Sequence, residues 1–201
     1  MLDWDKQRQE MVETQIKARG ITNPKVLDAF LKTPRHFFIP EALRDMSYED
    51  HPVSIGHGQT ISQPYLVALM TEHLELTGKE KVLEIGTGTG FQSAILSKLA
   101  KEVHTLEIVP PLADMAKALH KQLKRKNIKV LHKDGSQGYP QKAPYDRILV
   151  TAASKEIPPV FLKQLKKDGI LIIPIGNRFH QELKKLRKTK EGIEERAFTG
   201  F

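Results

Sequence analysis

The sequence predicts an α/β protein built on a doubly wound, mostly parallel sheet, and three observations carry this prediction. A glycine-rich turn at 86–90 joins a short apolar run to a helical pattern. Strand patterns and helical patterns then alternate as far as residue 175. Acidic residues stand at the ends of three predicted strands in succession: Glu84, Glu107 and Asp134. Such alternation is typical of a parallel sheet with helices packed on it.

The glycine-rich turn is the most informative stretch. Residues 82–85 form a short run that is apolar apart from Glu84, as in a strand buried on both faces. A helical pattern starts after Gly90. Glycines let a ligand approach the backbone, and the start of a helix offers free N–H groups to an anion. The dinucleotide fingerprint G-x-G-x-x-G would require glycine where Phe91 stands. The observed E-x-G-x-G-x-G resembles the first motif of class I S-adenosylmethionine (AdoMet)-dependent methyltransferases, which have a Rossmann-like fold; a dinucleotide site or a plain strand-to-helix turn remains open.

Composition sets broad limits. The 201 residues suit one domain, 1–201, and shares of 39% hydrophobic and 28% charged residues suit a soluble protein. No apolar stretch approaches the roughly 20 residues of a membrane span, and the charged N-terminus does not resemble a signal peptide. The chain has no cysteine, which excludes disulfides and Cys-ligated zinc. We expect a cytoplasmic protein with no metal site and no membrane contact.

The formal net charge of +8 is concentrated in two runs, at 117–133 and 184–190. Basic runs can bind nucleic acid, but they are more often solvated faces, and no aromatic residues interleave here to stack on bases. We therefore expect two solvated faces and no nucleic-acid partner.

The first 50 residues predict a helical cap that precedes the sheet. A helix over 5–19 ends at Gly20, and a second begins with Asn23 as N-cap and Pro24 at its first position. The segment Pro34-Arg-His-Phe-Phe-Ile-Pro40 predicts a buried extended stretch or turn, in which His36 packs or donates a hydrogen bond.

Residues 51–64 are rich in Gly, Ser and Thr and predict an irregular loop, in which His57 reads as an ordinary loop histidine. A helix follows from Pro64 with Leu66, Leu69, Met70 and Leu74 on its apolar face, and pattern alone makes Ser62 a helix cap.

The remaining segment, 65–201, predicts the sheet domain. The expected strands lie at 81–85, 103–108, 128–131, 147–150 and 169–175, with antiparallel closing strands at 181–187 and 193–198. Helices are expected at 110–123, with Met115 on the apolar face, and at 158–165. Ligands of open α/β sheets lie beyond the carboxyl ends of the strands. We therefore expect Glu107 on a ribose, Asp134 at an adenine edge and Glu84 near a methionine ammonium.

The whole chain, from about residue 11 to 187, resembles the protein-L-isoaspartate (D-aspartate) O-methyltransferase family. Three segments carry the resemblance: Pro34 to Pro40, the loop Gly58-Gln-Thr-Ile-Ser-Gln-Pro64, and Ile172-Ile-Pro-Ile-Gly176 with Gln181. The resemblance implies methyl transfer from AdoMet to the α-carboxylate of isoaspartyl (and D-aspartyl) residues in damaged proteins and peptides, which starts their repair through a succinimide.

Carried over by position, the resemblance makes Ser62 the active-site residue. It implies that Ile61, Gln63 and Pro64 contact substrate, and that AdoMet is bound by Thr60, Ser62, Tyr65, Glu84, Gly86, Gly88, Glu107, Asp134 and Gly135. Tyr65 stands where some members carry histidine. The family commonly ends in a strand of the type R-F-V-P-L, whereas this sequence reads Ala197-Phe-Thr-Gly-Phe201 at its end, from which we expect weaker substrate binding.

Two alternatives differ in class. A nucleic-acid methyltransferase fits the pI near 9.5, but Val150 is followed by Thr-Ala-Ala-Ser154 and not by the Asn/Asp-Pro-Pro-aromatic motif of base-amine methylation. A non-enzymatic binding module keeps the fold without turnover, although the retained glycines and acids argue against it. We expect a monomer, because a site that accepts varied peptides needs an open rim.

Overall fold

A seven-stranded sheet in the order β5-β4-β3-β6-β7-β8-β9 forms the centre of the structure, a computed structural model that describes residues 3–176 and 181–200. The strands are β3 (Lys81–Ile85), β4 (Glu102–Glu107), β5 (Ile128–His132), β6 (Tyr145–Val150), β7 (Leu165–Gly176), β8 (Gln181–Lys188) and β9 (Ile193–Phe198). The five strands from β5 to β7 are parallel, and β8 and β9 add antiparallel pairs. The predicted fold class and closing strands are confirmed. Phe201 lies outside the described residues.

Strand order reverses between β3 and β6. From β3 the chain moves outward to β4 and β5, then returns to β6 on the other side of β3. Such a reversal opens a crevice beyond the carboxyl ends of the two central strands, where ligands of this architecture bind. The glycine-rich turn follows β3 directly, which places it at this crevice.

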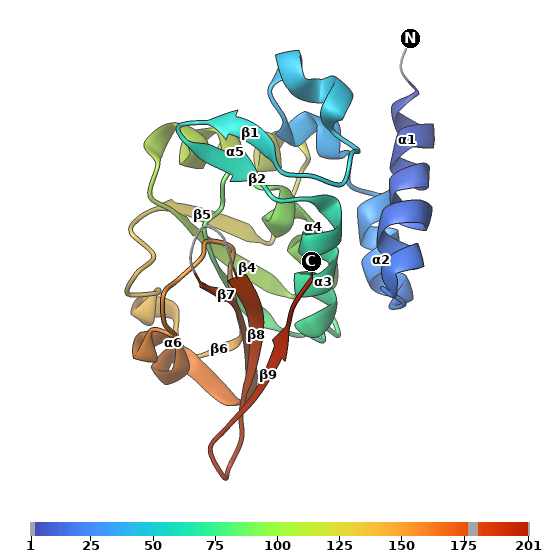
Figure 1. Ribbon diagram of the computed structural model, residues 1–201. Helices are drawn as coiled ribbons and strands as arrows, with labels where there is room; N and C mark the ends of the chain where they lie inside the picture. The colour runs from blue at the N-terminus through green and yellow to red at the C-terminus, as the bar shows by residue number, and fades with distance from the viewer. Residues whose placement is uncertain (1–2, 177–180, 201) are drawn as a thin grey trace.

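Both faces of the sheet are covered. Val82 and Leu83 are fully buried on opposite faces, because successive side chains of a strand alternate. The helices are α1 (Trp4–Glu10), α2 (Pro24–Leu31), α3 (Pro64–His73), α4 (Phe91–Leu99), α5 (Pro110–Gln122) and α6 (Pro159–Gln164). In Figure 1, α3 and α4 lie beside the sheet, α1 and α2 lie outside them, and α6 lies on the opposite side. One hydrophobic core contains residues of both the helical cap and the sheet. The predicted division of the domain into cap, loop and sheet segments at residues 50 and 64 therefore stays a prediction.

The cap agrees with the sequence in outline. After α1 the helix continues through a π-helical turn (Met11–Ile16) and a 3₁₀ turn (Lys17–Arg19) to Gly20, whose φ is +95°. The Asn23 side chain accepts a hydrogen bond from the Lys25 N–H, which confirms the N-cap. The segment between Pro34 and Pro40 forms a 3₁₀ turn (Arg35–Phe38), followed by a second at Glu41–Met46. His36 is buried and hydrogen-bonded through Nδ1 to the Tyr48 hydroxyl at 2.7 Å.

The expected irregular loop at 51–64 is wrong in part, because the segment contains a β-hairpin. Strands β1 (Val53–Gly56) and β2 (Gln59–Ile61) pair antiparallel, with Val53 opposite Ile61. His57 and Gly58 form the two-residue turn with φ of +54° and +69°, the signs that a tight hairpin turn requires. Val53 and Ile55 are buried and alternate with exposed neighbours, and this two-residue period was the available sequence signal for a strand. The hairpin lies over the carboxyl end of the sheet (Figure 1).

Two apolar faces differ from prediction. In α3 the buried side chains include Val67, Ala68 and Thr71 alongside Met70, whereas Leu66 and Leu69 are only half-buried. The helix packs between the cap and α4, so contact on two sides widens its buried surface. In α5, Met115 is 43% exposed and does not belong to the buried face.

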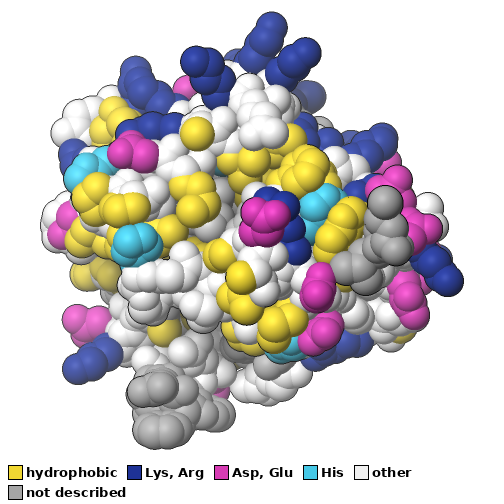
Figure 2. All heavy atoms as spheres, turned by 90° about the horizontal axis from the view of Figure 1, so that it is seen from above, with side chains coloured by type: hydrophobic (Ala, Val, Ile, Leu, Met, Phe, Trp, Pro, Cys, Tyr) yellow, Lys and Arg dark blue, Asp and Glu magenta, His cyan; other side chains and the backbone are white. Residues whose placement is uncertain are grey.

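The second basic run is less solvated than expected. Lys184 pairs with Glu195 at 2.5 Å, while Lys185 and Arg187 both pair with Glu75. These three cations are therefore committed to acids of the same protein. Figure 2 shows Lys and Arg side chains gathered along one edge of the face seen from above. Within the described residues no helix has the length and apolarity needed to cross a membrane.

Candidate active site

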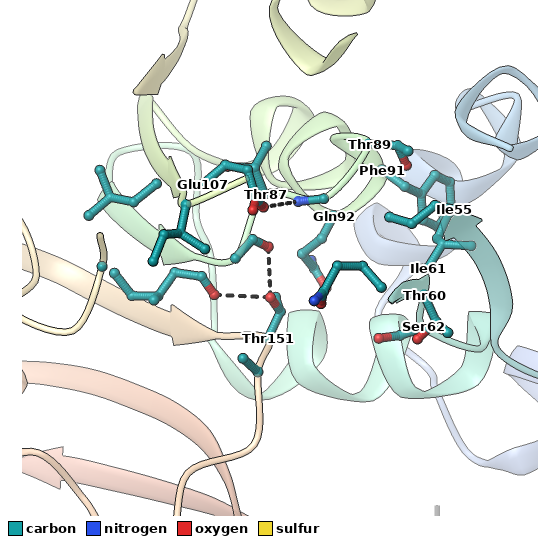
Figure 3. A pocket seen from close by; sticks show the side chains of 18 of the residues that line it. Ile55, Thr60, Ile61, Ser62, Thr87, Thr89, Phe91, Gln92, Glu107 and Thr151 are labelled. Carbon is teal, nitrogen blue, oxygen red and sulfur yellow. Dashed lines mark hydrogen bonds between the residues drawn. The ribbon is translucent and has the colours of Figure 1, made fainter. Parts of the chain in front are cut away.

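A cavity of about 350 Å³ lies beyond the carboxyl ends of β3, β4 and β5. It is lined by the glycine-rich segment 85–89, by residues at or just beyond the ends of β4, β5 and β6 (106–108, 134–136 and 151–152), by hairpin residues 58–62 and by side chains of α3 and α4. Figure 3 shows Glu107 and Thr87 on one side and Ile55, Thr60, Ile61 and Ser62 on the other. The crevice is thus closed above by the hairpin.

The glycine-rich turn brings bare backbone to the cavity wall. Gly86 has a φ of +95°, and a Cβ added there would stand 2.4 Å from the Thr151 hydroxyl oxygen. That hydroxyl contacts the carbonyl oxygens of Ile85 and Gly86 at 2.9 and 2.7 Å, which ties the turn to the end of β6. Gly86 is therefore required both by its backbone conformation and by the close approach of Thr151.

Glu107 ends β4 with its carboxylate held in place. Its Oε2 accepts a hydrogen bond from the Gly88 N–H at 2.7 Å and its Oε1 accepts one from the Val109 N–H at 2.9 Å. The side chain is 5% exposed and lies in the cavity lining. Each carboxylate oxygen has two lone pairs, so both can still accept a hydroxyl donor from a ligand.

The turn after β5 forms the far end of the cavity. Asp134 and Gly135 line it, and Asp134 Oδ1 accepts a hydrogen bond from the Ser136 N–H at 2.8 Å. A Cβ at Gly135 would stand 2.6 Å from Ile85 Cγ2, so this turn packs tightly on β3. Ile108 also lines the cavity and is 62% exposed, which offers apolar surface beside these polar groups.

Glu84 differs from the other two acids. Its side chain is fully buried, is absent from the cavity lining, and neither carboxylate oxygen has a hydrogen-bond partner. Burial, with a smaller contribution from the nearby charge of Glu107, raises the pKa of this carboxyl to about 8, and the neighbouring hydroxyl groups of Thr105 and Ser93 only partly offset this rise. Glu84 therefore lies behind the cavity lining, and its expected contact with an ammonium group stays a prediction.

The hairpin supplies Thr60, Ile61 and Ser62 to the cavity lining. The next three residues, Gln63, Pro64 and Tyr65, do not line the cavity. Gln63 is the N-cap residue of α3 without a side-chain bond, so Ser62 is not the helix cap that the pattern favoured. Pro64 is buried in the first turn of α3.

Tyr65 turns toward the helical cap. The Arg19 guanidinium lies 3.5 Å from the centre of the Tyr65 ring, and the Tyr65 N–H donates to Asp50 at 3.1 Å. Arg19 in turn pairs with Asp50 at 2.6 Å. The ring therefore serves the junction between cap and α3, and the expected contact with a cofactor finds no support.

Comparison with known proteins agrees with this geometry. The family model of protein-L-isoaspartate (D-aspartate) O-methyltransferase matches residues 6–199. The chain belongs to this family. A protein-L-isoaspartate O-methyltransferase of Syntrophus aciditrophicus is 48% identical over 196 residues, which are 97% of this chain and 90% of the relative. One of Methanoculleus marisnigri is 51% identical over 189 residues, 94% of this chain and 86% of the relative. The resemblance in the sequence is thereby confirmed.

Solved structures of the family have the same fold. A protein of Plasmodium falciparum that is assigned as a protein-L-isoaspartate O-methyltransferase, in complex with S-adenosyl-L-homocysteine, superposes with a TM-score of 0.82 at 27% identity, over 96% of this chain and 95% of its own. Another protein-L-isoaspartate O-methyltransferase gives a TM-score of 0.82 at 30% identity over 96% of this chain, which spans 64% of that protein's length.

The motif analysis missed two polar side chains in the lining. Thr89 and Gln92 are 2% and 6% exposed, and Thr89 Oγ1 and Gln92 Oε1 have no hydrogen-bond partner. Gln92 Nε2 donates to the Thr71 hydroxyl at 2.9 Å, which fixes the amide. A buried polar atom without a partner is costly, so these two side chains mark the polar part of the lining. The only available signal was their place at the end of the glycine turn and in the first turn of α4.

Proposed function

We propose that the protein transfers a methyl group from AdoMet to the free carboxylate of L-isoaspartyl residues, which is their α-carboxylate, and of D-aspartyl residues in damaged proteins and peptides. One observation carries this proposal: a single cavity joins the Glu107 carboxylate at the glycine-rich turn to Ser62 on the hairpin. The first group suits a ribose, and the second lies where a substrate enters between hairpin and sheet. Membership of the family supports the assignment.

The lining residues fit the cofactor group by group. Glu107, already held by two backbone N–H groups, accepts the ribose hydroxyls. Asp134 and Gly135 face the adenine, with the apolar side chain of Ile108 beside the ring. The bare backbone at Gly86 and Gly88 leaves room for the amino-acid portion, and Thr60 and Ser62 close it from above. When bound, AdoMet supplies a methyl group on a positively charged sulfur.

The chemistry needs no general base. An α-carboxyl group has a pKa of about 3.5 and is ionised at pH 7, so its oxygen is already a nucleophile. The protein has to orient this oxygen toward the methyl group and replace the water that it loses, and orientation alone can supply roughly 7–11 kcal/mol. We assign Ser62 the role of a hydrogen-bond donor to the carboxylate, beside substrate contacts of Ile61. The backbone nitrogen of the next residue then attacks the ester carbonyl, methanol leaves, and hydrolysis of the resulting succinimide returns some normal aspartate.

The test of this assignment is the variant Ser62→Ala. Loss of one donor to an ion should lower kcat/KM for an isoaspartyl peptide by about 10- to 100-fold. The methylated product of the wild type should lose methanol in mild base and leave a succinimide that is one water lighter than the starting peptide. The control is Ser54→Ala, an exposed serine of the same hairpin that does not line the cavity. Full activity of Ser62→Ala, or a base-stable product, would contradict the proposal.

We also propose that the protein acts as a cytoplasmic monomer. The absence of cysteine from the sequence is compatible with a reducing compartment, and a site that takes varied peptides benefits from an open rim. Light scattering of the purified protein tests whether it is a monomer, and a stable dimer would refute this part of the proposal.

A further inference from the structure

Arg35 is a fully buried arginine behind the active-site loop. Its side chain is 0% exposed, and it belongs to the 3₁₀ turn of the helical cap. Nη2 donates a hydrogen bond to the backbone carbonyl of Ser62 at 2.8 Å, and Nε donates one to the carbonyl of Ser47 at 2.8 Å. One planar group therefore fixes the loop residue Ser62 to the cap.

The same guanidinium also lies against Phe91, a second residue of the cavity lining. Its central carbon lies 4.9 Å from the ring centre of Phe91, which begins α4 and lines the cavity. Arg35 itself does not line the cavity. It stands behind two lining residues, one from the hairpin side and one from the glycine-turn side, and can set the distance between them.

The charge of Arg35 has no directly paired carboxylate among the residues that the structure describes. The carboxylate of Asp50, which acts on Arg35 through its charge, is paired with Arg19, and Arg35 Nη1 is buried without a hydrogen-bond partner. Burial lowers the pKa of the guanidinium to about 9, so it remains protonated at pH 7. An unpaired buried cation costs free energy, whereas an apolar side chain would fill this space without that cost.

We propose that Arg35 is a positioning residue that holds Ser62 for the substrate carboxylate and makes this end of the cavity favourable for an anion. Two features join here: the hydrogen bond to Ser62 and a buried positive charge without a counter-ion. A carboxylate that leaves water to meet Ser62 is stabilised by a cation behind the loop, because interactions between charges are stronger away from solvent. The inference rests on the proposed function, since it takes the substrate to be a carboxylate.

The test compares Arg35→Lys and Arg35→Gln with the control Arg147→Lys. Arg147 also donates to backbone carbonyls, those of Leu74, Glu75 and Asp146, but it stands near the amino end of β6, away from the cavity. We expect Arg35→Lys to lower kcat/KM for an isoaspartyl peptide by about 10- to 100-fold, because lysine keeps the charge but lacks the planar fork. Arg35→Gln should lower kcat/KM further, mainly by raising the KM for the peptide. The Kd for S-adenosylhomocysteine should stay unchanged, and Arg147→Lys should lower only the Tm.

Three results would overturn the inference. Full kcat/KM in Arg35→Lys would remove the positioning role, and equal peptide KM in the Lys and Gln variants would remove the role of the charge. A rise of the S-adenosylhomocysteine Kd in proportion to the loss of kcat/KM would mean that Arg35 acts only through Phe91. Circular dichroism well below the Tm verifies that each variant is folded. If Arg35→Gln does not fold, the test rests on Arg35→Lys alone. Failure of the wild type to methylate the peptide would instead refute the proposed function.

Discussion

Glu84 and Glu107 are acids near the carboxyl ends of neighbouring parallel strands, yet their surroundings give them different properties. Glu107 meets two backbone N–H groups and the cavity. Glu84 points into the interior, where neither oxygen has a hydrogen-bond partner. Sequence spacing predicts that both stand near the crevice, because strand ends converge there. It does not predict which side of the strand each side chain occupies relative to the turn that follows.

The buried carboxyl of Glu84 leads to a prediction about stability. In the unfolded chain this group has a pKa of 4.5, whereas burial raises the pKa in the folded protein to about 8. The unfolded chain therefore releases the proton first, and the free energy of unfolding falls as the pH rises from about 4.5 to about 8. Glu84→Gln cannot ionise, so its stability relative to wild type should increase over this window, by on the order of 3 kcal/mol at pH 7.

Urea unfolding at several pH values from 5 to above 8 measures this difference. The gap between Glu84→Gln and wild type should widen up to about pH 8 and then stay constant. Two stability curves that run parallel across the whole window would show that Glu84 is ionised in the folded protein and that its surroundings are more polar than the structure indicates.

At the scale of elements, the site is made where the glycine-rich turn after β3 meets the β1–β2 hairpin. The turn depends on residues whose conformation and packing leave no room for a side chain, as at Gly86. The hairpin carries Ser62, which is held from behind by Arg35 of the helical cap. Three segments far apart in the sequence thus define one cavity.

Gly86→Ala tests how the turn is specified. Gly86 and Gly20 have the same φ of +95°, but a Cβ at Gly20 meets nothing within 4 Å, whereas one at Gly86 meets the Thr151 hydroxyl. Gly20→Ala should cost about 1–2 kcal/mol from backbone strain alone. Gly86→Ala should cost about 1–3 kcal/mol more from the clash, and should also weaken binding of S-adenosylhomocysteine. Urea unfolding and calorimetric titration measure both effects; equal losses of stability with unchanged affinity would contradict the account.

Much of this arrangement could be predicted from the sequence, and the rest depends on contacts over long distances. The strand at 81–85, the turn and the acid at Glu107 follow from local apolar runs and glycine spacing. The hairpin was missed because Gly, Ser and Thr favour loops locally, while its pairing is fixed by the burial of Val53 and Ile61. The only local signal of Gln92 is its place in the first turn of α4, because the contact that fixes its amide is with Thr71 of another helix.

For the whole molecule, the distribution of charge bears on the choice of partner. Lys184, Lys185 and Arg187 of the second basic run pair with acids of the same protein, and Lys117 of the first run pairs with Asp114. Other cations of the first run form no ion pair among the described residues, but no described Lys or Arg lines the cavity. A nucleic-acid methyltransferase would instead need free cations around its site to contact phosphates. The high pI is therefore weak evidence for a nucleic-acid substrate.

RNA should bind weakly and remain unmethylated. With labelled AdoMet and mixed RNA at about 50 mM salt, we expect no label in RNA, and any binding should disappear by about 200 mM salt as nonspecific phosphate contacts are lost. An isoaspartyl peptide in the same reaction serves as the positive control. Transfer of label to RNA that persists at the higher salt concentration would revive the alternative of a nucleic-acid methyltransferase.

The most direct test of the central claim is methyl transfer from labelled AdoMet to two peptides that differ only in having isoaspartate or normal aspartate at one position. The account predicts base-labile label on the isoaspartyl peptide alone, because only that linkage presents an α-carboxylate beside the flexible methylene to the hairpin and Ser62. Equal labelling of both peptides, or no labelling of either by a protein that binds S-adenosylhomocysteine, would contradict it.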